Sequence, residues 1–397
     1  MNPAAFTEIA DIDVAGKKVL VRVDFDVPMK NGQILDDTKI RSALTTVSYL
    51  QEKDARIILM SHLGAPEGKV VNKFSLEPVA TRLAELLPDG EVILTDACVG
   101  DGAKRVALDL RDGQVAVLEN LQFHVGETRN DEKFARQLAS LGDVYINESF
   151  SVIHLKHASI AQVPRYLPKR AQGLRFAQEL KAFSQILGAV ERPYVAVLGG
   201  EAAPLKINLL QKLFDKADVI ILGGHMATTF MAAKRLPMGE SIIDRGLLPL
   251  ARDLMTKASH QQVRILIPED VVVSTDDNAT EGKIVPNHKV EPEMVVVDIG
   301  PRARTAFKEA ISRAETILWD GTMGCFDNPA FAEGTLSVAR AIAGSPALSV
   351  LGGADTFNAV KTFGLEKGFN HVSAGGDASL DLLAGKPLPG LQALEKK

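Results

Sequence analysis

Residues 194–200 read YVAVLGG, an apolar and β-branched run that ends in two glycines. The pattern returns as DVIILGG at 218–224 and as LSVLGG at 348–353. A buried strand, two glycines and a helix start form the turn with which doubly wound α/β folds bind phosphate, because glycine admits a close backbone approach and the helix offers free N–H groups. Three such turns in one half of the chain, with SAGGD at 373–377 as a fourth glycine-rich turn, predict a nucleotide site.

Strand-like runs alternate with helical patterns along the rest of the chain as well. These further runs lie at 17–25, 56–64, 114–120, 143–149, 263–268 and 315–321. Such alternation predicts βαβ units and mostly parallel sheets that helices cover on both faces. Because 397 residues are too many for one ordinary core, we expect an α/β protein of two domains.

The stretch LRFAQELKAFSQILGAVERP at 174–193 is amphipathic and helical and carries no strand pattern. We expect it to connect an N-terminal domain, 1–173, to a C-terminal domain, 194–385. A surface helix of either domain is the alternative interpretation. The C-terminal PLPGLQALEKK on its own is typical of a loose tail.

The composition, with 46% hydrophobic and 24% charged residues, is that of a soluble globular protein. A net charge of −5 leaves no excess of Lys and Arg for a nucleic acid. We expect no membrane span, because no apolar run reaches about 18 residues, and no signal peptide, because the first residues are acidic. Two distant cysteines, Cys98 and Cys325, favour a cytoplasmic protein over a disulfide framework or a thiolate zinc site.

The helix starts of the second half carry negative charge. Glu201, Asp355 and Asp377 lie at or beside them, where a carboxylate satisfies the helix dipole and competes with a phosphate. One carboxylate is compatible with phosphate if Mg²⁺ bridges the two, and simple capping is the alternative for Glu201 and Asp377. Neither GxxxxGK[ST] nor GxGxxG is present, which argues against P-loop NTPases and ordinary dinucleotide binders.

The first half carries polar side chains near its strand ends but few arginines in the loops that follow them. There is no nucleophile elbow, and the histidine spacing matches no usual zinc pattern, so solvent-facing loop histidines are the expected interpretation. The candidates are Asp24, Asp26, His62, His124, His154 and His157.

Taken in order, these segments resemble phosphoglycerate kinase over essentially the whole chain. The stretches that carry the resemblance are VRVDFDVP, LMSHLGAP, LENLQFHVGE, INESF…IHLKHAS, LGG…LKI, DVIILGGHMATTF, ILWDGTMGCFD, LGGADT and SAGGDASLDLLAGKPLPGL. The resemblance implies a monomer of two Rossmann-like domains joined by a hinge helix, with residues 386–397 folded back on the N-terminal domain. It also implies phosphoglycerate bound by the N-terminal domain and ATP or ADP with Mg²⁺ bound by the C-terminal one.

On the acid-substrate side, the chain departs from the family at its cations. Three arginines of the family that grip the phosphoglycerate correspond to Ala65, Gln122 and Leu155. The arginine that steadies the moving phosphoryl group corresponds to Lys39, which keeps the charge without the planar fork, and Arg41 stands two residues on. An asparagine of the family corresponds to Asp26. The residues that match the family are Asp24, His62 and His154.

The nucleotide side is altered as well. Ala202 stands where the family has the lysine that accompanies the phosphoryl group, and Asp377 stands at a glycine of the family. His225 also replaces a glycine, WNGP becomes WDGT with Asp320 and Thr322, and the ribose-binding glutamate becomes Asp327. The nucleotide-binding positions that the resemblance implies are Gly200, Lys206, Gly223, Gly224, Asp320, Asp327, Gly352, Gly353, Asp355 and Thr356, with Asp355 holding Mg²⁺ through the nucleotide.

Three functions remain open from the sequence. The main hypothesis is a protein of this fold whose phosphoglycerate kinase activity is lost or strongly reduced, and which acts by binding or regulation with an unknown protein partner. The alternative is an ATP-dependent kinase that forms an acyl phosphate on a different carboxylate. The second alternative is the ordinary glycolytic reaction, in which ATP and 3-phosphoglycerate give ADP and 1,3-bisphosphoglycerate.

Overall fold

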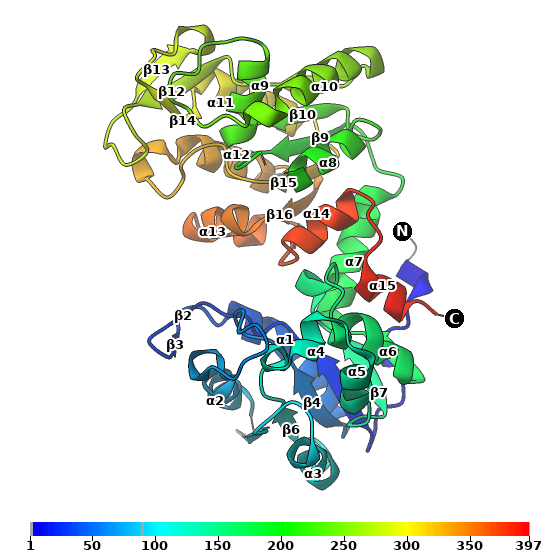
Figure 1. Cartoon of the computed structure of the whole chain (residues 1–397). Coiled ribbons are helices and arrows are strands. Elements are labelled where there is room, and N and C mark those ends of the chain that lie inside the picture. Colours follow the sequence, from blue (N-terminus) through cyan, green and yellow to red (C-terminus); the bar gives the residue numbers. More distant parts are fainter. Residues whose placement is uncertain (1–2, 89–90, 203, 397) are drawn as a thin grey trace. The chain divides into compact units, whose positions relative to one another are not determined.

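The computed structural model describes residues 3–88, 91–202 and 204–396, which form two compact units (Figure 1). The N-terminal unit comprises 3–181 together with 387–396, and the C-terminal unit comprises 182–386. The division falls inside helix α7 (Leu174–Leu187). The limits drawn from the sequence at 173 and 194 therefore stay predictions.

The N-terminal unit is built on a six-stranded parallel sheet with the strand order β5-β6-β4-β1-β7-β8. The central strands are apolar on both faces, and Val19, Leu20 and Val21 in β1 are fully buried. The strands are β1 (Lys18–Arg22), β4 (Arg56–Met60), β5 (Val92–Leu94), β6 (Val115–Val117), β7 (Val144–Asn147) and β8 (Lys169–Gln172), with a hairpin of β2 (Met29–Lys30) and β3 (Gln33–Ile34). The helices are α1 (Thr38–Glu52), α2 (Glu77–Leu86), α3 (Asp101–Asp109), α4 (Val125–Thr128), α5 (Glu132–Ala139) and α6 (Val163–Tyr166).

The C-terminal unit repeats the plan with a second six-stranded parallel sheet, in the order β11-β10-β9-β15-β16-β17. Its strands are β9 (Tyr194–Leu198), β10 (Val219–Leu222), β11 (Arg264–Leu266), β15 (Thr316–Asp320), β16 (Leu348–Gly352) and β17 (His371–Val372). Its helices are α8 (Pro204–Leu213), α9 (Gly224–Ala233), α10 (Leu248–Gln261), α11 (Pro301–Ser312), α12 (Glu333–Ala343), α13 (Ala354–Thr362) and α14 (Asp377–Leu383). The expected α/β class with two parallel sheets is thus confirmed.

A small antiparallel sheet in the C-terminal unit is absent from the sequence-based prediction. It consists of β12 (Asp270–Ser274), β13 (Lys283–Pro286) and β14 (Val295–Ile299) in the order β13-β12-β14. Two of these strands, β12 and β14, are valine-rich, as parallel strands are, but they pair antiparallel with each other, and β13 pairs antiparallel with β12.

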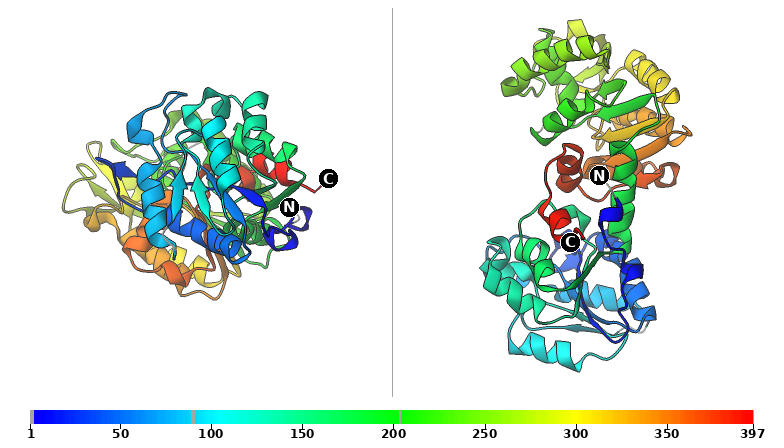
Figure 2. Two further views of the ribbon diagram at one scale, coloured as in Figure 1. Left: turned by 90° about the horizontal axis from the view of Figure 1, so that it is seen from below. Right: turned by 90° about the vertical axis from the view of Figure 1, so that its right-hand side faces the viewer.

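The C-terminal segment is packed rather than loose. Helix α15 (Pro389–Leu394) buries Leu391 and Leu394 in the N-terminal unit, and a Cβ on Gly390 would lie 2.9 Å from the Cβ of Ile153. Segments near the two ends of the described chain lie side by side (Figure 2), where the Lys396 backbone N–H donates to the Ala5 carbonyl at 3.0 Å. The prediction of a loose tail is therefore wrong, because buried apolar side chains hold this segment against the N-terminal unit.

Among the described residues, no helix combines the length and the apolar character that a membrane crossing requires.

Candidate functional site

Glycine turns meet at the carboxyl ends of four adjacent strands, β10, β9, β15 and β16. A Cβ on Gly199 would lie 2.1 Å from the Thr322 carbonyl oxygen, and a Cβ on Gly223 would lie 2.5 Å from the Met323 sulfur. Gly200 has a φ of +63°, in the left-handed region that favours glycine. The glycines that the sequence singles out therefore let these turns pack directly against one another.

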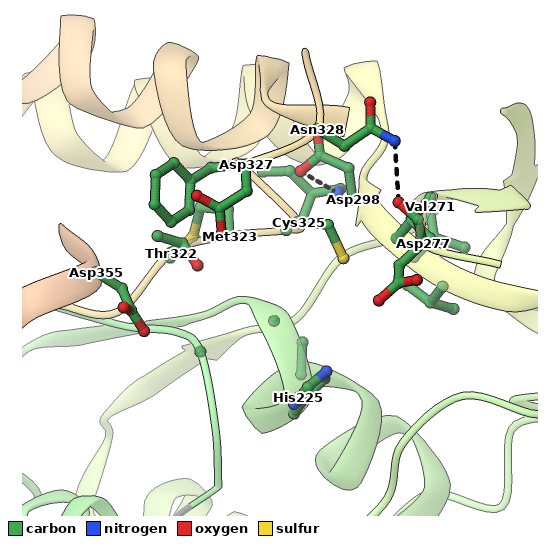
Figure 3. Close-up of a pocket in the computed structure, with 18 of the residues that line it drawn as sticks. His225, Val271, Asp277, Asp298, Thr322, Met323, Cys325, Asp327, Asn328 and Asp355 are labelled. Atoms are coloured by element: carbon green, nitrogen blue, oxygen red, sulfur yellow. Dashed lines mark hydrogen bonds between the residues drawn. The ribbon is translucent and has the colours of Figure 1, made fainter. Parts of the chain in front are cut away.

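Beside these turns lies a pocket of about 590 Å³ within the C-terminal unit (Figure 3). One part of its lining is apolar, with Met231, Val271, Ile299, Met323 and Phe326. Its ionisable groups are Glu201, Asp277, Asp298, Asp327, Asp355, His225 and Cys325. The lining residues identified in the described structure include neither Lys nor Arg. The pocket thus combines an apolar wall with a surplus of carboxylates.

The titration of the lining groups follows from their burial. Burial raises the pKa of Asp298 to about 7, although its carboxylate accepts hydrogen bonds from the backbone N–H of Gly334 at 2.7 Å and of Ile299 at 2.8 Å. Burial also lowers the pKa of His225, with Glu201 acting in the opposite direction. Because a lowered pKa leaves the imidazole neutral at pH 7, His225 supplies no positive charge to the pocket.

Lys206 lies at the first turn of α8, next to the pocket. Its Nζ donates to the Gly199 carbonyl at 2.8 Å and lies 3.0 Å from Oδ1 of Asp320. This oxygen accepts no well-aligned hydrogen bond among the described residues, so charge holds the pair together. The two side chains are 13% and 3% exposed, which makes this a largely buried ion pair.

In the N-terminal unit, Asp24 forms the centre of the predicted acid-substrate side. Its Oδ2 lies 2.9 Å from Nζ of Lys39 and also accepts a hydrogen bond from the Ser151 hydroxyl. Burial alone would raise the pKa of Asp24, but the charge of Lys39, with His62 and Ser151, holds it below its ordinary value. Lys39 is thereby engaged by a carboxylate within its own unit.

His62 and Asp26 flank this pair. Burial, with the adjacent Arg22 guanidinium, lowers the pKa of His62 to about 4, so the ring is neutral at pH 7. Arg22 is itself fully buried, with Nε donating to the Ser159 hydroxyl at 2.8 Å. The Oδ1 of Asp26 accepts from the Gly64 backbone N–H at 2.8 Å. Asp26 therefore fixes the loop that follows β4, a structural role in addition to its negative charge.

The positions of the missing arginines are accessible in this unit. Ala65 is exposed, and Gln122 and Leu155 are half-buried. Arg41 lies two residues beyond Lys39, and its Nε donates to Asp37 at 2.9 Å. His154 keeps a buried Nδ1 without a hydrogen-bond partner among the described residues.

The loop histidines differ in their surroundings. His124 stacks on Phe134 with ring centroids 4.3 Å apart and accepts the Gly126 N–H. Burial and Arg22 lower the pKa of His157 to about 4. The described residues contain no cluster of three His, Cys, Asp or Glu side chains suited to a metal ion.

Of the predicted nucleotide-side residues, Gly200, Gly224, Asp327 and Asp355 line the pocket. Lys206, Asp320, Gly352, Gly353 and Thr356 form a contiguous group around Gly321, whose N–H donates to the Thr356 hydroxyl at 2.7 Å. Ala202 is half-buried before α8, and Asp377 is exposed at the first residue of α14. The ligand contacts assigned to these residues stay predictions.

Several lining residues were not identified from the sequence. Asp277 and Asn278 come from the loop between β12 and β13, and Asn328 Nδ2 donates to the Asp277 carbonyl at 2.9 Å. Cys325 faces the same pocket, and burial raises the pKa of its thiol. No motif marks the loop, because its place depends on the antiparallel sheet.

Comparisons with known proteins agree across the whole chain. The family model described as phosphoglycerate kinase matches residues 9–386. A phosphoglycerate kinase of Anaeromyxobacter sp. (strain K) is 43% identical over 396 residues, covering 99% of this chain and 100% of the relative. One of Roseiflexus sp. (strain RS-1) is 45% identical over 388 residues, covering 97% and 98%.

Solved structures give the same result. The phosphoglycerate kinase of Coxiella burnetii superposes with a TM-score of 0.89 at 34% identity, and that of Pyrococcus horikoshii OT3 with 0.85 at 29% identity. Each comparison covers 98% of both chains. With this agreement in sequence, fold and glycine turns, the chain belongs to the phosphoglycerate kinase family.

Proposed function

We propose that this chain binds an adenine nucleotide in its C-terminal unit, and that its turnover of 3-phosphoglycerate is lost or strongly reduced, so that it acts by binding or regulation. The observation that carries the proposal is shared by both units. Lys39 and Lys206, the cations left at the two predicted substrate sides, lie 2.9 Å from Asp24 and 3.0 Å from Asp320. A phosphate must therefore compete with a carboxylate for either lysine.

The pocket supports a Mg-nucleotide in part. Its apolar wall suits a purine face, and the exposed carboxylate of Asp355, at the start of α13, suits a hydrated Mg²⁺. A bound nucleotide would supply the phosphoryl group, and the first turns of the helices that follow the glycines would face its phosphates, because the N–H groups of Gly199, Gly200, Gly223 and Gly224 are bonded within the protein. The glycine turns and Asp355 thus fit a Mg-nucleotide. The described lining of the pocket, however, contains no Lys or Arg to pair with the phosphates.

The magnitude of the expected loss follows from the replaced side chains. A charge-assisted hydrogen bond contributes roughly 1.5–3 kcal/mol, so losing three arginines weakens phosphoglycerate binding by very roughly 10³–10⁶-fold. Losing one donor to the transition state costs a further factor of about 10²–10³ in rate. Phosphoryl transfer relies on positioning and on cations, which makes these losses direct losses of catalysis.

The ordinary phosphoglycerate kinase reaction is the second candidate. Relatives that carry this name are 43% and 45% identical over nearly the full chain, and this likeness favours the family activity. We also propose a cytoplasmic location, which the free thiols of Cys98 and Cys325 favour.

Calorimetry with Mg-ATP and Mg-ADP, followed by a coupled assay with 3-phosphoglycerate, separates the candidates. We expect nucleotide binding with turnover far below ~10 s⁻¹, an ordinary enzyme rate. Turnover at or above that rate would establish the second candidate. Absence of nucleotide binding would remove the nucleotide from the proposal. Binding without turnover calls for a screen of other carboxylates, since a kinase for a different acid remains the alternative.

Restoring the arginines provides an independent test. The triple variant Ala65→Arg/Gln122→Arg/Leu155→Arg should raise 3-phosphoglycerate affinity by roughly 10³-fold or more, measured by calorimetry. The control is Leu108→Arg in α3, where the side chain is 69% exposed and an added charge should leave affinity unchanged. Equal affinity in the triple variant and the control would contradict the role given to the missing arginines.

A further inference from the structure

The environment of Lys206 is closed by groups of the protein itself. Its Nζ donates a hydrogen bond to the Gly199 carbonyl and is paired by charge with Asp320, whose Oδ1 lies 3.0 Å away. The glycine turns surround the same ammonium group: a Cβ on Gly321 would lie 2.7 Å from Nζ, and a Cβ on Gly200 would lie 3.3 Å from it. Lys206 therefore lies where two glycine turns approach its ammonium group closely, and its charge is already balanced there.

Asp320 reaches a second glycine turn with its other oxygen. A Cβ on Gly352 would lie 3.0 Å from Oδ2, and a Cβ on Gly353 would lie 3.1 Å from it. Gly353 precedes α13, whose N-terminus offers free N–H groups to an anion. The carboxylate thus lies between the lysine and a helix start, two features that would otherwise both favour a phosphate.

We propose that Asp320 is a specificity-determining residue: its carboxylate takes the place of a phosphate charge at Lys206, so the site binds the phosphates of a nucleotide less tightly than it would with an uncharged residue at this position. The inference rests on the proposed function where it takes adenine nucleotides as ligands. Glu201 and Asp355, both exposed and both in the pocket lining, act in the same direction because they repel an unmetallated phosphate.

Charge alone distinguishes Asp320 from the residue that the family resemblance places there. Asparagine has nearly the same shape and keeps a side-chain oxygen, but it leaves the ammonium charge of Lys206 unbalanced. Asp320→Asn therefore changes the net charge of the pair from zero to +1 with little change in packing. The double variant Lys206→Met/Asp320→Asn returns the net charge of the pair to zero.

The test is calorimetry without divalent cations, with pyrophosphate, ADP and adenosine as probes. Asp320→Asn should bind pyrophosphate and ADP about 10- to 100-fold more tightly than the unaltered chain, since one charge-assisted contact becomes available. Adenosine affinity should stay the same. The double variant should match the unaltered chain with every probe. The matched control is Asp381→Asn, which breaks another Lys–Asp pair of this unit, with Lys386 at 2.6 Å, and should change nothing.

The outcomes are distinct. Equal pyrophosphate affinity in Asp320→Asn and the unaltered chain overturns the proposal, as does a double variant that binds pyrophosphate more weakly than the unaltered chain. If pyrophosphate binding tightens while neither adenosine nor ADP binds any variant, the nucleotide function fails and the role of Asp320 stands. Emission from the neighbouring Trp319, whose Nε1 donates to the Gly321 carbonyl at 2.8 Å, reports whether the variant is folded. Asp320→Ser serves the same test if the Asn variant does not fold.

Discussion

His62 shows, at the scale of one residue, how burial decides charge. It is 7% exposed, and its Nδ1 lies 3.2 Å from Nη2 of Arg22. Protonation would place a second cation beside a buried guanidinium, so the imidazole stays neutral down to a pKa of about 4. A histidine that matches the family position is thus a neutral group here down to a pKa of about 4, whereas an exposed imidazole gains a proton near pH 6.5.

This lowered pKa predicts a pH dependence of stability. Between pH 6.5 and about 4 the unfolded chain binds a proton at His62 and the folded chain does not, so His62 lowers the free energy of unfolding as pH falls through this window. The loss from pH 7 to pH 5 is about 2 kcal/mol. We expect His62→Gln to lack that part of the loss in urea unfolding followed by circular dichroism.

The comparison must be between variant and unaltered chain at each pH, because Asp298, with a pKa raised to about 7, changes stability in the opposite direction. His260→Gln, at an exposed residue of α10, is the control and should follow the unaltered chain. Parallel pH curves for His62→Gln and the unaltered chain would show that burial of this ring has no energetic effect.

At the scale of an element, Glu148 accepts a backbone hydrogen bond at the start of α7. It follows β7, and its carboxylate accepts from the Thr46 hydroxyl at 2.8 Å and from the backbone N–H of Arg175 at 3.0 Å. Gly173 leaves the necessary space, because a Cβ there would lie 1.8 Å from the carboxylate. The helix that the sequence predicts as a connector therefore begins on a buried carboxyl group, whose pKa burial raises to about 7.

Glu148 should weaken the fold as pH rises. From pH 4.5 to 7 the folded chain keeps a proton that the unfolded chain loses, so the free energy of unfolding falls, by about 2–3 kcal/mol between pH 5 and pH 8. Glu148→Gln should remove this fall in urea unfolding at the two pH values. Glu77→Gln, at an exposed acid in the first turn of α2, is the matched control. A fall in Glu148→Gln as large as that of the unaltered chain would refute the assignment, since Asp298, with a pKa also raised to about 7, contributes a fall of its own to both chains.

At the scale of the whole molecule, the chain returns to its N-terminal unit through α15 (Figure 1). Leu391 and Leu394 are buried there, and each large apolar side chain contributes about 1.5–3 kcal/mol when fully buried. Loss of the segment should destabilise the N-terminal unit and leave the C-terminal unit unaffected.

Deleting residues 387–397 tests this prediction. The single tryptophan, Trp319, is buried in the C-terminal unit, so its fluorescence follows that unit alone, whereas circular dichroism follows both. We expect part of the dichroism transition to move to lower urea while the fluorescence transition stays in place. Gln392→Ala, on the exposed side of α15, should move neither. Equal shifts of both transitions would mean that the units do not unfold independently.

The sequence alone was sufficient for the α/β class, the glycine turns and the family, because alternating apolar runs and glycine pairs are local patterns. It missed β8, whose KRAQ is polar, and the antiparallel sheet, whose strands resemble parallel ones. Only the tertiary structure decided that Lys206 meets Asp320 and that Asp277 joins the pocket. These contacts join residues far apart in the chain, and adjacent parallel strands bring their carboxyl ends to one edge of a sheet irrespective of sequence distance. Whether a lysine at a family position is free or already balanced by a carboxylate is therefore a property of the fold.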